Sequence, residues 1–243
     1  MASTSAPSPM EALSIVIPAY NEASRIGPTL QRITEYGRER FKEFEILVVN
    51  DGSSDKTTEV AESYANAANQ LRVLQNPGNR GKGYSVRAGA LAAKYPYVLL
   101  SDADLSTPIE ELEILATEAN LDTIVIASRG MQESRLEIRQ AWYREQMGKI
   151  FNGIVQLLLL PGIQDSQCGF KLFGRNVVDR IFPLMHTEGF AFDVELLART
   201  LRAGFRVVEL PVRWRNDEGT RVNAIKDSMV MLKDVLAVWW KLR

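Results

Sequence analysis

Short apolar runs alternate with helix-like segments through the first hundred residues, and this alternation constrains the fold more than any other feature of the sequence. The runs occupy residues 13–17, 45–49, 71–74 and 98–100. The segments between them carry helix signals, such as the proline in the first turn of residues 28–41. Strands that are apolar throughout and are joined by helices are typical of a parallel sheet covered on both faces. The sequence therefore predicts an α/β fold with a mostly parallel central sheet.

The second half of the chain is less regular but continues with the same kinds of element. We expect strands over residues 123–127 and 170–173, and helices over residues 143–160, 193–202 and 226–242. Residues 1–11 are expected to form a disordered tail, because the first ten carry no charged side chain and lack the apolar core of a signal peptide. One domain over residues 12–224 and an amphipathic C-terminal helix over residues 225–243 complete the predicted organisation.

Charge and cysteine content exclude several classes of function. The 29 basic and 30 acidic side chains give a net charge of −1, so no global positive field favours nucleic acid. One cysteine and one histidine exclude a disulfide framework and a zinc site rich in Cys or His. The longest uncharged stretch, residues 150–164, is interrupted by Pro161 and is shorter than the about 20 residues that span a bilayer. We expect a cytoplasmic protein whose chemistry uses carboxylates, arginines and backbone amides.

Polar loops follow three of the predicted strands. Residues 18–22 read PAYNE, residues 50–55 read NDGSSD and residues 102–104 read DAD. The carboxyl ends of parallel strands meet at one edge of a sheet, and ligands bind there. Asp, Asn, Gly and Ser are also the usual residues of turns and helix caps, which would explain any one such loop. Three of them at one edge favour a functional site.

Five motifs occur in order along the chain: PAYNE at 18–22, VNDGSSD at 49–55, NRGKG at 79–83, DAD at 102–104 and DSQCGFK at 165–171. Together they resemble the inverting glycosyltransferases of family 2, which have the GT-A (Rossmann-like) fold. The branch that the sequence most resembles contains the dolichyl-phosphate β-glucosyltransferases and the dolichol-phosphate mannose synthases, and the glucosyl members are slightly closer. The resemblance extends from about residue 13 to the C-terminus.

A nucleotide-sugar donor carries a diphosphate, so its site needs positive charge. Asp102 and Asp104 are one residue apart, and in an extended segment their side chains point the same way. The resemblance implies that they hold Mg²⁺ or Mn²⁺ against the diphosphate and that Asp102 also contacts the ribose. It further implies that Lys82, otherwise a solvated surface lysine, neutralises the donor phosphates and that Arg221 contacts them. The base and ribose pocket would be formed by Pro18, Tyr20, Glu22 and Asp51.

A phosphate acceptor changes the catalytic requirements. Its second pKa is near ~6, so at neutral pH it is largely dianionic and nucleophilic without a general base. The resemblance places Asp165 where a base would act, or where a carboxylate would orient the acceptor or a nearby arginine. Guanidinium groups match phosphate oxygens in bidentate geometry, so the candidates for binding the lipid phosphate are Arg129, Arg139 and Arg144. The alternative for these arginines is a solvated charged face.

The C-terminal segment has a pattern that suits a membrane surface. A helix over residues 225–243 places Ile225, Met229, Leu232, Leu236 and Trp240 on one face, and Lys226, Lys233 and Lys241 towards the other. Adjacent tryptophans beside lysines are typical of a membrane interface. The alternative is a terminal helix packed on the core. We expect peripheral attachment at the cytoplasmic face of a membrane.

The sequence favours a metal-dependent inverting hexosyltransferase that moves glucose from UDP-glucose to dolichyl or polyprenyl phosphate and gives a β-linked product. Two alternatives in the same class are a GDP-mannose-dependent dolichol-phosphate mannose synthase and a family 2 enzyme with a soluble saccharide acceptor. A nucleotidyltransferase is disfavoured, because no Gly-rich phosphate loop with a lysine follows the first strand. A non-catalytic module that binds nucleotide sugars is disfavoured by the intact DAD motif and by Asp165.

Overall fold

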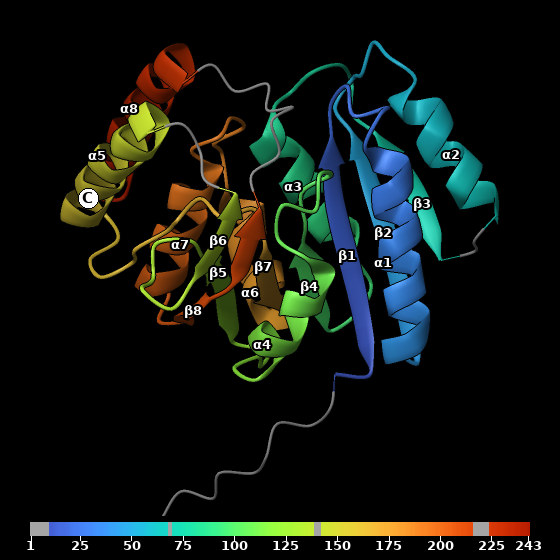
Figure 1. Cartoon of the computed structure of the whole chain (residues 1–243). Coiled ribbons are helices and arrows are strands. Elements are labelled where there is room, and N and C mark those ends of the chain that lie inside the picture. Colours follow the sequence, from blue (N-terminus) through green and yellow to red (C-terminus); the bar gives the residue numbers. More distant parts are fainter. Residues whose placement is uncertain (1–9, 68–69, 139–141, 216–223) are drawn as a thin grey trace, which may run out of the picture.

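A seven-stranded sheet forms the centre of the molecule, in the order β3-β2-β1-β4-β7-β5-β8 (Figure 1). The computed structural model describes residues 10–67, 70–138, 142–215 and 224–243. The strands of the sheet are β1 (Ala12–Ala19), β2 (Glu43–Asn50), β3 (Leu71–Gln75), β4 (Tyr97–Leu100), β5 (Thr123–Ser128), β7 (Lys171–Gly174) and β8 (Arg206–Pro211). β7 is antiparallel to both of its neighbours, and the other neighbouring strands are parallel. The predicted fold class is confirmed.

Helices cover both faces of the sheet, because successive side chains of a strand point to opposite sides. Ile15, for example, belongs to one buried cluster and Val16 to the other. The cluster around Ile15 is covered by α1 (Ile26–Arg40), α2 (Thr57–Ala67) and α4 (Leu112–Ala116). The cluster around Val16 is covered by α3 (Lys82–Ala92), α5 (Trp142–Leu158), α6 (Arg175–Ile181), α7 (Phe192–Arg202) and α8 (Ala224–Lys241). Burial on both faces explains why the central strands are apolar throughout.

The reversed direction of β7 brings an additional loop to the edge of the sheet at which β1, β2 and β4 end. Leu100, the last residue of β4, pairs with Lys171, the first residue of β7. The loop over residues 165–170 therefore reaches the same edge as the loops that follow β1, β2 and β4. If β7 ran parallel to β4, this loop would enter from the opposite edge.

Every strand and helix predicted above is present, with ends that differ by at most two residues. The prediction lacks α4 and α6, the short strand pair β6 (Arg135–Ile138) and β9 (Arg213–Arg215), and the edge strand β8. Two 3-10 turns, η1 (Ile109–Glu111) and η2 (Phe182–Leu184), also lie outside it. These elements are short, and β8 is only partly buried along its length, so none of them has the uniformly apolar run that marks a central strand.

The C-terminal helix α8 packs against α5 and α7 (Figure 1). Its residues Met231, Val235 and Val238 are buried in this contact. Residues 1–9 of the predicted tail lie outside the described residues, and the division of the chain into tail, domain and helix stays a prediction. Among the helices in the described ranges, none has the length and apolarity needed to cross a membrane.

Candidate active site

The loops after β1 and β2 interlock at the carboxyl edge of the sheet. The backbone N–H of Asn21 donates to Ser53 Oγ over 2.8 Å, and Asn21 Oδ1 accepts from the N–H of Ser54 over 2.7 Å. The N–H of Glu22 donates to Thr57 Oγ1 over 2.7 Å. Asn21 has a φ of 56°, a left-handed conformation that asparagine tolerates. The two loops thus form one rigid unit at the place where a donor would bind.

The predicted base and ribose residues differ in what they present to a ligand. Tyr20 is 42% exposed at the edge, and Pro18 beside it is half-buried. Glu22 forms an ion pair with Arg25, with 2.6 Å between Oε2 and Nη2. The tyrosine ring is therefore available for stacking on a base, whereas the Glu22 carboxylate fixes the start of α1.

Asp51 fixes the position of the loop directly before α3 by hydrogen bonds. Its carboxylate accepts hydrogen bonds from Asn76 Nδ2 over 2.8 Å and from the backbone N–H groups of Arg80 and Gly81 over 2.9 and 2.8 Å. The residue is 4% exposed. Asp51 therefore acts on the site through the position of residues 80–82, in addition to any ribose contact that its sequence motif implies.

Lys82 begins α3 and forms an ion pair with Asp102, with 2.6 Å between Nζ and Oδ1. Gly81 has a φ of +100°, and a Cβ there would lie 2.5 Å from the carbonyl oxygen of Glu188. A Cβ on Gly83 would lie 2.4 Å from the carbonyl oxygen of Thr187. Burial would lower the pKa of Lys82, but the charges of Asp102 and Asp193 raise it above its ordinary value, so the side chain is an ammonium group.

Asp102 and Asp104 follow β4 and have the donor chemistry of a divalent cation site. Burial and the charge of Asp102 raise the pKa of Asp104, as expected for two carboxylates held close together. A Cβ on Gly169 would lie 1.9 Å from Asp102 Oδ2, so this glycine makes room for the carboxylate. The described residues contain no group of three or more His, Cys, Asp or Glu side chains arranged to hold a metal. Two carboxylates nevertheless fit Mg²⁺ or Mn²⁺, because such ions are usually bound by one or two carboxylates together with substrate phosphates.

Arg129 and Asp165 form a bidentate pair beside this site. The distance from Arg129 Nε to Asp165 Oδ2 is 2.7 Å, and that from Nη2 to Oδ1 is 2.9 Å. The guanidinium carbon also lies 5.4 Å from the ring centre of Trp214. Burial would lower the pKa of Arg129, but the charge and hydrogen bond of Asp165 raise it, and the charge of Asp102 acts in the same direction. The loop that carries Asp165 also lies against Asp102, because a Cβ on Gly169 would be 1.9 Å from Asp102 Oδ2.

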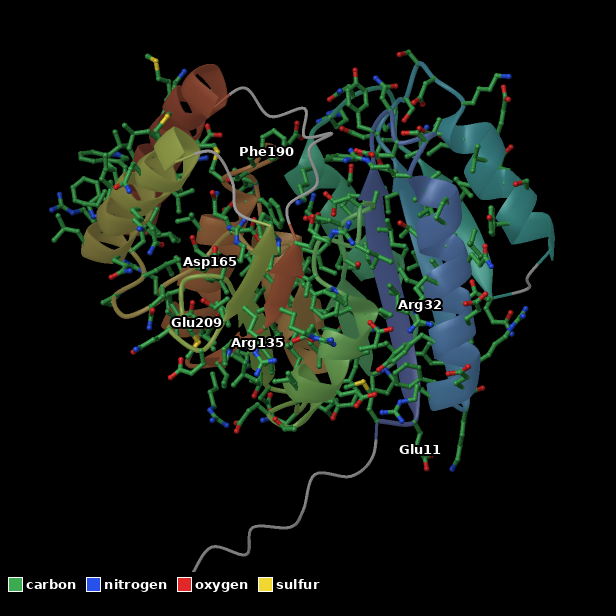
Figure 2. The ribbon with its side chains drawn as sticks, in the orientation of Figure 1. Glu11, Arg32, Arg135, Asp165, Phe190 and Glu209 are labelled. Carbon is green, nitrogen blue, oxygen red and sulfur yellow. The ribbon has the colours of Figure 1, made fainter. Side chains whose placement is uncertain are left out.

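Glu209, on β8, holds the loop that carries Asp165 (Figure 2). Its two carboxylate oxygens accept the backbone N–H groups of Gln164 and Asp165 over 2.8 and 2.7 Å. Asn152 of α5 donates to the carbonyl oxygen of Gln164 over 2.6 Å. Sequence reasoning missed Glu209, because nothing in its local pattern indicates a contact to a loop 44 residues earlier in the chain.

A buried ion pair supports the site from inside the core. Lys171 is 0% exposed, and its Nζ lies 2.6 Å from Asp193 Oδ1. The same ammonium donates to the carbonyl oxygen of Cys168. Cys168 is itself buried, as expected for a packing residue. The segment over residues 165–171 is thus fixed at both ends, by Glu209 and by Asp193.

Three predicted site residues are not placed by these contacts. Arg139 and Arg221 lie outside the described residues. Arg144 belongs to α5, and its side chain lies outside the described part of the molecule. The roles expected for these three arginines stay predictions.

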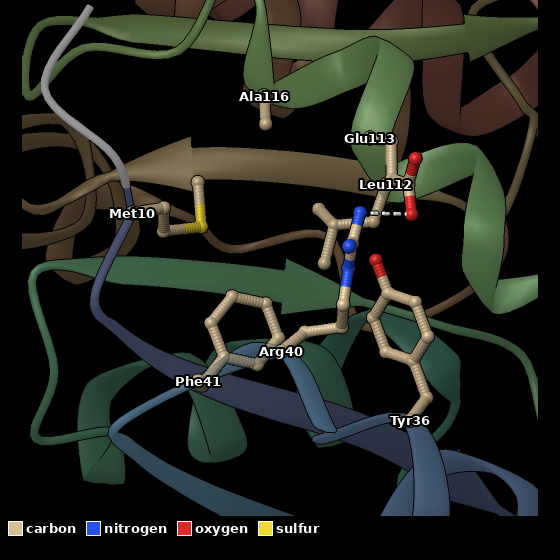
Figure 3. A pocket seen from close by; sticks show the side chains of 7 residues that line it. All are labelled: Met10, Tyr36, Arg40, Phe41, Leu112, Glu113 and Ala116. Carbon is tan, nitrogen blue, oxygen red and sulfur yellow. Dashed lines mark hydrogen bonds and ion pairs between the residues drawn. The ribbon is translucent and has the colours of Figure 1, made fainter. Parts of the chain in front are cut away.

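A cavity of about 250 Å³ lies at the opposite edge of the sheet, near the C-terminal end of α1 (Figure 3). It is lined by Met10, Tyr36, Arg40, Phe41, Leu112, Glu113 and Ala116. Its two charged side chains, Arg40 and Glu113, pair with each other across it. None of the site residues described above lines it, so it is not part of the candidate active site.

Comparison with protein families gives a match to the model described as "Glycosyl transferase family 2" over residues 14–182. A dolichyl-phosphate beta-glucosyltransferase of Trichomonas vaginalis is 37% identical over 93% of this chain and 70% of its own length. The Saccharomyces cerevisiae protein of that name is 34% identical over 93% of this chain and 73% of its own length. The Homo sapiens protein is 33% identical over 95% of this chain and 76% of its own length.

Solved structures with the same fold include glucosyl-3-phosphoglycerate synthase from Mycobacterium tuberculosis. Its complex with Mn²⁺, uridine diphosphate and glucosyl-3-phosphoglycerate matches with a TM-score of 0.68 at 16% identity, over 96% of this chain and 80% of that chain. Its complex with Mg²⁺ and uridine diphosphate matches with a TM-score of 0.66 at 18% identity, over 96% and 79%. At this identity the likeness concerns the fold.

Proposed function

The chain belongs to glycosyl transferase family 2, and from this we propose that it transfers glucose from UDP-glucose to dolichyl phosphate or a related polyprenyl phosphate. The transfer inverts the anomeric carbon and gives a β-linked product. The observation that carries the proposal is the position of the Arg129 guanidinium, fixed by Asp165, whose loop lies against Asp102 at Gly169. A cation for an acceptor phosphate thus stands beside carboxylates suited to a metal-bound donor.

On the donor side, Asp102 and Asp104 would hold Mg²⁺ or Mn²⁺, which when bound neutralises charge on the departing diphosphate. Lys82 places an ammonium group beside the same carboxylates. Tyr20 is exposed at the same edge, where its ring can stack on the nucleotide base. The names of the curated relatives favour glucose as the sugar, and we adopt UDP-glucose as the donor on that ground.

On the acceptor side, a dianionic phosphate needs orientation more than deprotonation. Arg129 offers a fork of donors that matches phosphate oxygens. Both oxygens of Asp165 are engaged by that guanidinium, so the carboxylate is an anchor for Arg129 in this proposal. The alternative role as a general base would require Asp165 to release the arginine first.

The lipid acceptor would reach the site from a surface formed by α5 and α8, which lie side by side (Figure 1). This surface carries exposed apolar side chains: Ile150, Leu157, Met229, Leu236 and Trp240. The buried residues of α8 form a different face of the helix, so α8 both docks on the core and leaves apolar side chains outside. We assign this surface to peripheral contact with the cytoplasmic face of a membrane.

A transfer assay tests the proposed function. Purified protein is incubated with dolichyl phosphate in detergent, with Mn²⁺ or Mg²⁺, and with radiolabelled UDP-glucose or GDP-mannose in parallel. We expect label in the lipid phase from UDP-glucose, and none with the Asp104→Ala variant. If label enters the lipid phase only from GDP-mannose, the transferred sugar is mannose and the assignment of glucose is wrong. Donor turnover onto soluble sugars with no label in lipid would overturn the acceptor assignment.

A further inference from the structure

We propose that Lys82 couples the binding of the divalent cation to the binding of the nucleotide diphosphate, because its ammonium is the counter-ion of Asp102 until the cation binds and can then pair with the diphosphate. This inference rests on the proposed function, since it takes the cation and diphosphate site at Asp102 and Asp104 as given. It adds a role for Lys82, which favours binding of the cation and the diphosphate together over binding of either one alone.

The contact that carries the inference is the ion pair between Lys82 Nζ and Asp102 Oδ1, at 2.6 Å. The other oxygen, Oδ2, lies against the backbone of Gly169. A Cβ added to this glycine would be only 1.9 Å from Oδ2. The carboxylate thus has Oδ1 on the ammonium and Oδ2 against Gly169, and 34% of the side chain remains exposed. A divalent cation that coordinates this carboxylate brings a second positive charge to the Lys82 ammonium, so the ammonium must move away.

At the start of α3, the backbone is fixed and the side chain of Lys82 is the part that can move. The backbone N–H of Gly83 donates to the carbonyl oxygen of Glu188 over 2.7 Å, and the N–H of Gly81 donates to Asp51 over 2.8 Å. Side chains at positions 81 and 83 would collide with the chain over residues 187–189. The start of α3 is therefore fixed, and the flexible carbon stem of Lys82 is the part that can reorient.

The displaced ammonium needs a new anion, and among the described carboxylates whose charges act on Lys82 none is spare, because Asp102 and Asp104 would hold the cation. Asp193, whose charge also acts on Lys82, is already paired with the buried Lys171 over 2.6 Å. A diphosphate at the N-terminal end of α3 would provide the missing negative charge. With cation and diphosphate both bound, the two aspartates, the lysine and the phosphates all have partners of opposite charge.

Either ligand alone leaves one charge without a partner. The cation alone separates Lys82 from Asp102, and the diphosphate alone brings phosphate oxygens towards two carboxylates. Each ligand therefore tightens the other, and by thermodynamic reciprocity it does so by the same factor. Without the ammonium, we expect the protein to bind the cation more tightly in the absence of diphosphate, and to bind the diphosphate more weakly in the absence of the cation. A purely structural role of Lys82 would weaken both.

The test measures Mn²⁺ binding by electron paramagnetic resonance of the free ion, and UDP binding by calorimetry, each with and without the other ligand. We expect Lys82→Met to bind Mn²⁺ alone about fivefold more tightly than the native protein, and to bind UDP alone about fivefold more weakly. In Lys82→Met, the factor by which bound UDP increases the affinity for Mn²⁺ should be smaller than in the native protein. Lys82→Arg keeps the positive charge and should retain most of the native coupling.

Lys94→Met is the matched control, because Lys94 lies two residues beyond the other end of α3 and its loss changes the net charge equally. It should bind both ligands as the native protein does. Unchanged or weaker Mn²⁺ binding by Lys82→Met in the absence of UDP would overturn the coupling role while the proposed function stands. If the native protein binds neither Mn²⁺ nor UDP, in any combination, the proposed function falls as well.

Discussion

Asp165 gives both of its carboxylate oxygens to the side chain of Arg129, with 2.7 Å from Oδ2 to Nε and 2.9 Å from Oδ1 to Nη2. Oδ2 also accepts the backbone N–H of Arg129 over 2.9 Å. Such a fork-to-fork arrangement fixes the plane of a guanidinium group as well as its position. The pair therefore supplies an oriented cation rather than a free base.

The variant Asp165→Asn separates these two roles. It removes the counter-charge of Arg129 and one hydrogen bond, so we expect the KM for dolichyl phosphate to rise about tenfold, with a smaller effect on kcat. Loss of a general base would instead lower kcat by a factor of about 10² to 10⁴. Steady-state kinetics with both substrates varied distinguish the outcomes. Asp179→Asn, which breaks the exposed pair with Arg175, is the control.

The pH dependence of the reaction follows from the same pair. Burial would raise the pKa of Asp165, but the charge and hydrogen bonds of Arg129 hold it below its ordinary value. A carboxyl with a depressed pKa in the folded state stabilises the fold above its unfolded value of about 3.9, and this stabilisation is lost as the pH falls through the folded value. The pair is thus intact at neutral pH and adds no activity change between about pH 5 and 8.

We therefore expect the decrease of kcat/KM at acidic pH, the acidic limb of the profile, to reflect protonation of the acceptor phosphate, whose second pKa is about 6. The check compares a polyprenyl phosphate with the matching phosphonate, which has a higher second pKa. The limb should move to higher pH with the phosphonate. A limb that stays in place would belong to a group on the enzyme and would argue against the dianion as the nucleophile.

Gly169→Ala tests whether Asp102 is placed by the backbone that faces it. A Cβ at position 169 would lie 1.9 Å from Oδ2, and the carboxylate is the part that can move. We expect the variant to fold, its transfer rate to fall by a factor of about ten or more, and the Mn²⁺ concentration needed for half-maximal activity to rise. Gly153→Ala on α5, where a Cβ meets no atom within 4 Å, is the control for the metal site: it should keep the native metal dependence and gain about 0.5–1 kcal/mol of stability. Native metal dependence in Gly169→Ala would remove the positioning role.

The proposed membrane surface can be tested away from the candidate site. Leu236 on α8 is 47% exposed, so Leu236→Glu should leave the melting temperature unchanged and reduce flotation with anionic lipid vesicles severalfold. Leu121→Glu is the control, because Leu121 is 41% exposed and does not belong to α5 or α8. Equal vesicle binding by both variants and the native protein would assign the apolar face of α8 to another role.

The sequence predicts the strands well because their burial on both faces demands apolar side chains throughout. It also predicts that Asp51 and Asp102 lie at one edge, since the carboxyl ends of parallel strands coincide there. Both inferences use only local composition and a general rule of chain direction. They required no knowledge of which side chains touch.

The pairs that orient those side chains depend on the path of the chain, which local patterns do not encode. Arg129 and Asp165 are 36 residues apart, and they meet because β7 runs antiparallel between β4 and β5. The contact between Lys82 and Asp102 likewise depends on the packing of Gly81 and Gly83 against residues 187–189. Motifs thus indicate which residues belong to the site, and tertiary packing decides which of them act through one another.

Glu209 belongs to none of the five motifs, and its effect on the proposed acceptor side can be tested. Its carboxylate accepts two successive backbone N–H groups, over 2.8 and 2.7 Å, and so sets the position of Asp165. In Glu209→Gln an amide NH₂ replaces one acceptor, and one N–H group loses its partner. We expect stability to fall by about 0.5–1.5 kcal/mol, because the hydrogen bond from Asp165 is only partly buried and that from Gln164 is exposed.

The kinetic signature should be specific to the acceptor. Because Asp165 anchors Arg129, a shifted loop should raise the KM for dolichyl phosphate severalfold and leave the KM for the sugar nucleotide unchanged. Glu133→Gln, at an exposed position, is the control and should match the native protein in both. If Glu209→Gln raised both KM values equally, Glu209 would serve only the general stability of the fold, and the link from β8 through Asp165 to the acceptor would be broken.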